Sequence, residues 1–197
     1  MLYHNDKSIL FFNGEFKNVK DFRISPFNQT LHYGYGVFEG LRAYNAQNNP
    51  HIFKVKRHFE RLAKSAEKIN IQMPYSVQEM INFAYELLER NDMREAYIRP
   101  LVLMDKNMTL RALDADKPNL LMTCWKWNRY YPSNHLKVLV SSWRRPHPRT
   151  MPVDIKVTGN YVNSILATRE AHQKGYDDAL LLDVEGYIAT GPGASFF

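Results

Sequence analysis

The sequence lacks the features of a secreted or membrane-spanning protein. It contains 197 residues with one cysteine, and it has no long apolar run. A single thiol, Cys124, cannot form a disulfide within the chain, which favours a reducing compartment. The first apolar stretch, residues 9–12, is broken at once by Asn13-Gly14, and no later stretch is long enough to span a bilayer. We therefore predict a cytoplasmic protein.

Concentrated charge is also lacking. The formal net charge is +6, which alone leaves a nucleic-acid partner open. The basic residues are spread along the chain, however, and the one dense basic segment, residues 143–149, has a single aromatic residue at its start. Proteins that bind single strands alternate basic and stacking aromatic residues. A small molecule that carries a phosphate or carboxylate is therefore the expected ligand, and we expect neither a nucleic-acid nor a membrane partner.

What the sequence contains is enough apolar material for a sizeable core, with 45% hydrophobic and 13% aromatic residues. Strand-like and helix-like segments alternate, without internal repeats, and predict an α/β (α+β) fold. We predict an N-terminal α/β domain over residues 1–130, an interdomain linker over 131–136 and a second domain over 137–197. The expected elements are a hairpin over 9–19, helices over 56–69 and from 76 onward, strands over 97–103, 119–127 and 135–143, a helix over 160–174 and a hairpin over 178–189.

Some of these predictions rest on specific residues. Asn13-Gly14 is a strong hairpin signal, and residues 76–79 read Ser-Val-Gln-Glu, which is a capping box at a helix start. In the helix over 160–174 the apolar residues Val162, Ile165 and Leu166 are expected to be buried.

Three segments carry candidate chemistry. Residues 31–44 combine three glycines with three tyrosines, which indicates backbone close to a ligand or another chain, or else a tight aromatic turn. Arg99 lies in an otherwise apolar strand, on the same face as Tyr97, and must pair with a carboxylate of the chain or bind one from outside. Lys156 precedes a Gly-Asn-Tyr turn, a setting that suits a reactive amine but also a surface loop.

Taken together, the segments at 31–42, 97–101, 156–161 and 182–188 resemble, in this order, the branched-chain amino-acid aminotransferases. These are fold-type IV enzymes that use pyridoxal 5'-phosphate. The resemblance implies a two-layer N-terminal domain followed by the first part of a larger, barrel-like cofactor domain. It implies amino transfer between leucine, isoleucine or valine and 2-oxoglutarate, in a homodimer or higher oligomer in which residues 105–110 would reach over to the partner subunit.

The resemblance also implies a role for each matching residue. Lys156 matches the catalytic lysine that holds the cofactor covalently, Tyr161 the tyrosine at the ring hydroxyl, and Arg61 the arginine at the phosphate. The residues that match substrate-binding positions are Tyr33, Phe38, Gly40, Tyr97, Arg99, Trp127 and Tyr130. Among them Arg99, helped by Tyr33 and Tyr130, would take the distal carboxylate of glutamate, while Phe38, Trp127 and Tyr161 would wall an apolar pocket. No metal site is implied.

Two departures from the family pattern affect the expected activity. Family members have a Glu-Gly-x-Gly-x-Asn segment where this chain reads Thr190-Gly191-Pro192-Gly193-Ala194-Ser195. Thr190 thus replaces the glutamate that pairs with the cofactor's ring nitrogen, and a hydroxyl supplies no negative charge. The family also continues for roughly another domain's worth of sequence. The alternatives are a slow or non-catalytic paralogue, or a D-amino-acid aminotransferase or aminodeoxychorismate lyase of the same fold type.

Overall fold

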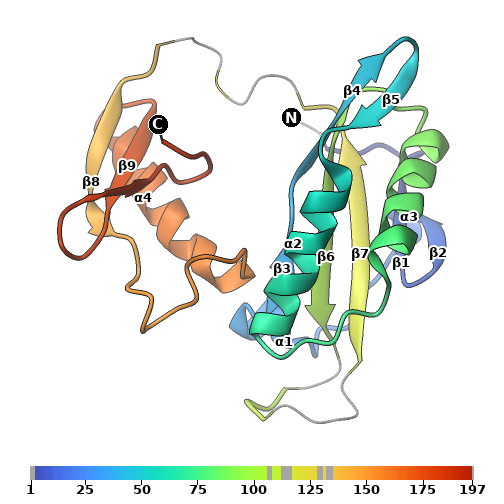
Figure 1. Ribbon diagram of the computed structural model, residues 1–197, viewed down its shortest axis with the longest axis horizontal. Helices are drawn as coiled ribbons and strands as arrows, with labels where there is room; N and C mark the ends of the chain where they lie inside the picture. Colours follow the sequence, from blue (N-terminus) through green and yellow to red (C-terminus); the bar gives the residue numbers. More distant parts are fainter. Residues whose placement is uncertain (1–2, 106–107, 112–116, 128–130, 132–134, 197) are drawn as a thin grey trace. The chain divides into compact units, whose positions relative to one another are not determined.

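The computed structural model describes residues 3–105, 108–111, 117–127, 131 and 135–196. The chain divides into two compact units, Met1–Asn128 and Arg129–Phe197 (Figure 1). Both units combine a sheet with helices, which confirms the mixed α/β (α+β) class. In the described part of the chain the longest helices have 14 residues, and none has the length and hydrophobicity that a bilayer crossing requires.

The first unit is built on a seven-stranded sheet. Its strands run in the order β2-β1-β7-β6-β4-β5, and β3 pairs with β6 beside β4. All pairings in the sheet are antiparallel. The strands are β1 (Ile9–Phe12), β2 (Glu15–Asn18), β3 (Gly36–Phe38), β4 (Leu41–Ala46), β5 (Asn49–Ile52), β6 (Ala96–Met104) and β7 (Pro118–Trp125).

Two helices, α2 (Val55–Lys68) and α3 (Val77–Arg90), lie side by side over one face of this sheet (Figure 1). A short 3-10 helix, η1 (Val19–Asp21), follows β2, and α1 (Gln29–Tyr33) precedes β3. The unit therefore has two layers. The capping box at α3 is confirmed, because Ser76 and Glu79 bond each other's backbone N–H groups. The predicted hairpin turn is confirmed as well, with positive φ at both Asn13 and Gly14.

The two faces of the sheet differ in what they carry. Ile98 of β6 pairs with Cys124 of β7, and both are buried on the helix side, where the Cys124 Sγ lies 4.0 Å from the Leu87 carbonyl of α3. Since side chains alternate along a strand, Tyr97 and Arg99 lie on the opposite face and are partly exposed. This alternation separates a structural face from a face that can bind a ligand.

The second unit is a smaller three-stranded sheet with one helix. β8 (Val138–Arg144) pairs in parallel with β9 (Asp178–Leu182), and β10 (Ile188–Thr190) is antiparallel to β9. The connection from β8 to β9 contains a 3-10 turn, η2 (Thr158–Asn160), and the helix α4 (Tyr161–Gln173). This is a β-α-β crossover with an added hairpin strand, and no closed barrel occurs in the described residues.

The buried face of α4 differs from the prediction. Val162 and Ile165 are 59% and 57% exposed, so the expectation that they are buried was wrong. The helix instead turns its small residues inward, and Ala167 and Ala171 pack against Ala179 and Leu181 of β9. Small side chains let the helix approach the sheet closely. The apolar periodicity failed here because α4 carries apolar side chains on more than one face.

Candidate active site

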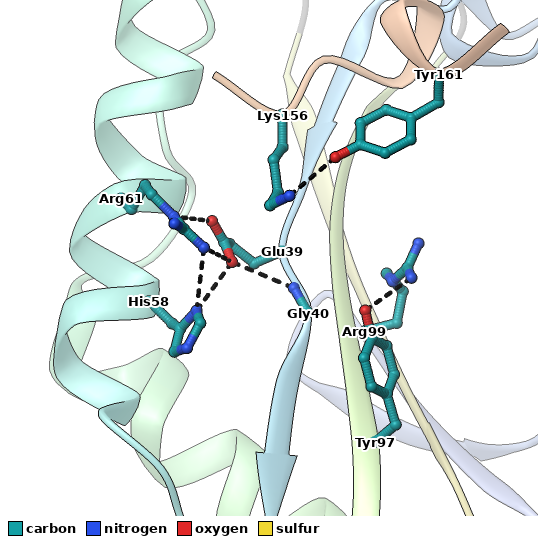
Figure 2. A network of polar contacts seen from close by, with 8 residues as sticks. All are labelled: Glu39, Gly40, His58, Arg61, Tyr97, Arg99, Lys156 and Tyr161. Carbon is teal, nitrogen blue, oxygen red and sulfur yellow. Dashed lines mark hydrogen bonds and ion pairs between the residues drawn. The ribbon is translucent and has the colours of Figure 1, made fainter. Parts of the chain in front are cut away.

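The first group of candidate site residues surrounds a buried carboxylate. Glu39 lies between β3 and β4, and its side chain is 0% exposed. Its two oxygens accept hydrogen bonds from Nε and Nη2 of Arg61, the latter over 2.7 Å. His58, one turn earlier on α2, lies with its Nδ1 3.0 Å from Glu39 Oε2, and the Gly40 N–H donates to the same oxygen over 3.2 Å (Figure 2).

These partners decide the charge of Glu39. Burial alone would raise the pKa of this carboxyl, but the hydrogen bonds from His58 and Arg61, together with the Arg61 charge, outweigh it and hold the pKa below its usual value. The side chain is therefore an anion at neutral pH. It fixes one edge of the Arg61 guanidinium, while the Arg61 side chain remains 51% exposed.

Gly40 is required by the close approach of Tyr97. A Cβ built at Gly40 would lie 1.9 Å from the Tyr97 hydroxyl oxygen and 2.7 Å from Cζ of the ring. No side chain fits in that space. The glycine at this position therefore lets the Tyr97 phenol lie against the backbone between β3 and β4.

Arg99 is held by aromatic rings rather than by an acid. Its Nη2 donates to the Tyr97 hydroxyl over 2.9 Å, and its Cζ lies 4.5 Å from the ring centre of Phe38 and 5.2 Å from that of Tyr97. Its Nε is buried and has no hydrogen-bond partner. Within the described residues, no carboxylate forms an ion pair with this guanidinium. A partly buried cation of this kind can bind a carboxylate from a ligand.

The aromatic surroundings of Tyr97 include two tryptophans. The Trp127 ring packs edge-on against Tyr97 at 4.8 Å, and Trp125 lies 5.0 Å from Tyr97 and 5.8 Å from Trp127. The Trp127 carbonyl accepts a hydrogen bond from Arg42. Together these rings form an apolar wall on the sheet face opposite the helices.

Tyr33 is the last residue of α1. Its hydroxyl donates to the Met108 carbonyl over 3.1 Å, and its ring is partly exposed. Tyr130, which the sequence predicts to assist Arg99, lies outside the described residues, as do residues 106 and 107 of the predicted contact loop.

In the second unit, a lysine and a tyrosine are paired. Lys156 lies in the segment that precedes η2, and Tyr161 is the first residue of α4. The Lys156 Nζ donates to the Tyr161 hydroxyl over 2.8 Å and lies 5.6 Å from the ring centre (Figure 2). The 3-10 turn fixes this spacing, since Asn160 is buried and its Nδ2 donates to the Pro152 carbonyl.

Thr190, at the end of β10, makes local contacts. Its hydroxyl donates to the Gly191 carbonyl over 2.9 Å, with the Ala194 carbonyl 3.4 Å away. The Gly191 N–H donates to the Ala194 carbonyl over 3.1 Å, which closes a tight turn. With its proton directed at the backbone, the hydroxyl can offer only a neutral oxygen to a ligand.

Two functional candidates were missed by the sequence analysis. Glu39 was recognised only as part of a motif, and His58 was not considered. A signal was present, because a charged residue between Phe38 and Gly40 in a buried segment requires a cationic partner. His58 and Arg61, three residues apart on a helix, share one face and can supply it together.

Comparison with known protein families identifies the family of this chain. Residues 36–197 match the family described as amino-transferase class IV. The chain belongs to the class IV aminotransferases. That match includes nearly all of the candidate residues, and of those in the described part only Tyr33 precedes it.

The chain is also similar to individual aminotransferases, in sequence and in structure. The chain is 37% identical over 194 residues to a branched-chain-amino-acid aminotransferase of Pseudomonas aeruginosa, covering 96% of this chain and 63% of that protein. The crystal structure of the Escherichia coli branched-chain aminotransferase matches with a TM-score of 0.92 and 31% identity, over 95% of this chain and 63% of that one. The crystal structure of the branched-chain aminotransferase of Thermoproteus uzoniensis with norvaline matches with a TM-score of 0.90 and 33% identity. This match covers 94% of this chain and 63% of that one.

These class IV relatives are longer than the chain. The chain spans less than two thirds of the length of the curated relatives it matches. The family match covers residues 36–197 and the structural match covers 95% of the chain, whereas the activity and the ligands are inferred from the site.

Proposed function

We propose that the chain carries out pyridoxal-phosphate-dependent amino transfer between a branched-chain L-amino acid and 2-oxoglutarate. The observation that carries the choice of substrates is Arg99. Its guanidinium is held between the rings of Phe38 and Tyr97, its buried Nε has no partner, and no described carboxylate pairs with it. An aromatic wall with one such cation suits an apolar side chain in one half-reaction and a second carboxylate in the other.

The donor set fits the cofactor. An amine beside a phenol suits a pyridoxal ring, because Lys156 can bind the cofactor's carbonyl carbon while Tyr161 bonds the ring hydroxyl. Arg61, half exposed and fixed along one edge, suits the phosphate. Thr190 would accept a hydrogen bond at the ring nitrogen. The residues assigned to the cofactor are thus Lys156, Tyr161, Arg61 and Thr190.

The chain's own residues would perform distinct parts of the reaction. Bound pyridoxal phosphate supplies the electrophilic carbonyl and an electron-withdrawing ring. The Nζ of Lys156 would hold and move the proton that leaves the substrate Cα. The Tyr161 hydroxyl, 2.8 Å from that nitrogen, orients it. Arg99 and Tyr97 bind carboxylate oxygens, and Phe38 and Trp127 exclude water from the apolar side.

The experiment that tests this proposal measures absorbance after the protein is mixed with pyridoxal phosphate. We expect a visible band from cofactor bound covalently to a lysine, and borohydride reduction followed by peptide mass mapping should place the adduct on Lys156. Lys156→Ala is the control and should show neither band nor adduct. A wild-type protein without a band, or with its adduct on another lysine, would refute the proposal.

Arg99 tests the choice of substrates. Arg99→Gln should raise KM for 2-oxoglutarate by about 10- to 100-fold, since a charge-assisted hydrogen bond contributes about 1.5–3 kcal/mol. The leucine half-reaction should change much less. Equal losses for both substrates would show that Arg99 does not distinguish them.

A cofactor-binding protein with impaired turnover is the second candidate. Thr190 favours it, since its hydroxyl donates to the Gly191 carbonyl and it carries no charge. Thr190→Glu should then increase the leucine half-reaction rate, because a carboxylate favours the protonated ring. An unchanged rate would exclude this explanation. The homodimer and the cytoplasmic location remain predictions.

A further inference from the structure

Glu39 is an acid whose burial requires an explanation. Its side chain is 0% exposed, and transferring a carboxylate out of water costs several kcal/mol even after relaxation. All of its partners in the described structure are polar groups aligned on its two oxygens, from Arg61, His58 and Gly40. An apolar side chain of similar size would often stabilise such a site equally well. The arrangement therefore suggests a purpose other than stability.

The contact with Arg61 controls orientation. Nε and Nη2 belong to one edge of the planar guanidinium, and each meets a different oxygen of Glu39. A two-point contact fixes both the plane and the rotation of the group, which a single hydrogen bond does not. Arg61 has a long side chain that is 51% exposed, so a two-point contact restricts rotamers that solvent exposure alone would permit.

Glu39 is itself held in place from two further directions. His58 Nδ1 contacts Oε2 at 3.0 Å from the same helix as Arg61, and the Gly40 N–H contacts it at 3.2 Å from the sheet. The carboxylate is thus anchored to both layers of the unit (Figure 2). The orientation of Arg61 is consequently tied to the sheet that carries Tyr97 and Arg99.

We propose that Glu39 is a positioning residue that sets the Arg61 guanidinium in the orientation that binds the phosphate ester of the cofactor, with His58 bracing the carboxylate. This inference rests on the proposed function, in which Arg61 binds that phosphate. Glu39 does not touch the ligand in this scheme. It acts only through Arg61, so its effect must depend on the presence of the phosphate group.

The experiment compares the dissociation constants of pyridoxal phosphate and pyridoxal, which differ in the phosphate alone. The measured quantity is the dissociation constant of pyridoxal divided by that of pyridoxal phosphate, which is large when the phosphate is recognised. This ratio is measured for the wild type, Glu39→Gln, Glu39→Asp and Arg61→Gln. In Glu39→Gln the ratio should fall by about tenfold, the equivalent of one charge-assisted hydrogen bond lost at the phosphate. Glu39→Asp keeps the negative charge on a side chain that is one methylene shorter. The ratio should therefore fall less in Glu39→Asp than in Glu39→Gln.

Two control variants separate orientation from charge and stability. Glu60→Gln removes a negative charge from the helix that carries Arg61, at a residue whose ion pair is with Lys56. Leu87→Ala creates a cavity in the core beneath α3, where Leu87 is buried, and leaves Arg61 on α2 unchanged. Both should keep the wild-type ratio, and Leu87→Ala should have a lower Tm. If Glu39→Gln does not fold, the ratio in Glu39→Asp decides the question.

Each outcome has a defined reading. An unchanged ratio in Glu39→Gln with a lowered Tm would make Glu39 merely structural and would leave the proposed function intact. If the wild-type ratio equals that of Arg61→Gln, Arg61 does not bind the phosphate, and the inference is refuted together with that part of the proposed function. A wild type that binds neither compound overturns both. A ratio that falls in Glu39→Gln and Arg61→Gln but not in the controls supports the inference.

Discussion

The first unit and the second hold their candidate residues by different means. In the first, Glu39, Arg61 and Arg99 lie on or beside regular elements and are fixed by hydrogen bonds or ring contacts to their neighbours. In the second, Lys156 precedes a 3-10 turn, and Thr190 ends a three-residue strand. The first has a core of large side chains, such as Phe59, whereas the second packs Ala167, Ala171, Ala179 and Leu181.

This difference suggests a division of labour. Binding groups that must keep one geometry are located where large side chains and buried contacts resist movement. The amine that would change its bonding partner in the proposed reaction lies in the segment between β8 and η2, outside regular secondary structure. The following changes test that division, from the largest expected effect to the smallest.

The largest effect is expected at Lys156. Lys156→Arg keeps a positive charge but cannot bind a carbonyl carbon or accept the Cα proton at neutral pH, so amino transfer should fall by about 10²–10⁴-fold or more. Steady-state kinetics with leucine and 2-oxoglutarate measure this loss. Arg61→Lys, in the first unit, should instead weaken cofactor affinity and largely retain kcat at saturating cofactor. A kcat loss at Arg61 as large as that at Lys156 would contradict the division.

The two helices α2 and α4 should respond differently to loss of an apolar side chain. Leu62 of α2 is fully buried, and Leu62→Ala should lower the free energy of unfolding by about 2–5 kcal/mol. Ile165 of α4 is 57% exposed, and Ile165→Ala should change it by less than about 0.5 kcal/mol. Urea unfolding monitored by circular dichroism checks both. A large loss in Ile165→Ala would mean that another surface covers this side of α4 in solution.

Gly40→Ala tests the close packing of the first unit. The added methyl would overlap the Tyr97 hydroxyl, so Tyr97 must move, at a cost of about 1–3 kcal/mol in stability. The Tyr97–Arg99 hydrogen bond should be lost with it. Tyr97→Phe combined with Gly40→Ala should relieve part of this cost, because the overlapping oxygen is gone. Equal stabilities of the single and double variants would place the strain elsewhere.

The smallest effect concerns acid stability in the second unit. Hydrogen bonds from Lys174, Ser141 and Ser142 lower the pKa of Glu170 from 4.5 to about 2. Because the folded pKa lies below the unfolded value, this contribution is present above pH 4.5 and is lost as the pH falls toward 2. In Glu170→Gln the free energy of unfolding should depend less on pH in that range than it does in the wild type. A wild-type and a variant protein with parallel acid unfolding curves would show that the contact contributes little in water.

The sequence predicted features that depend on local chemistry. The Asn13-Gly14 turn and the capping box at Ser76 both formed, because their signals involve residues only a few positions apart. The short elements α1 and β5 were missed, because a helix of five residues and a strand of four carry too little periodicity.

The features that sequence did not predict depend on contacts between distant residues. Glu39 meets Arg61 only after α2 folds onto the sheet, so no local pattern indicates how deeply the acid is buried. The buried face of α4 was predicted wrongly for a related reason. Ala167 and Ala171 are weak signals beside Val162 and Ile165, and the sheet that selects them lies in other parts of the chain.

The single cysteine provides a probe of how the first unit opens. Cys124 lies on β7 beneath α3, is 6% exposed, and burial raises its pKa to about 12. A thiol in this state does not react with an alkylating reagent until the strand is uncovered. The rate at which a reagent labels Cys124 therefore reports the local opening of the helix layer from the sheet. Because Cys124 is the chain's only thiol, the natural sequence can be used for this measurement without an introduced label site.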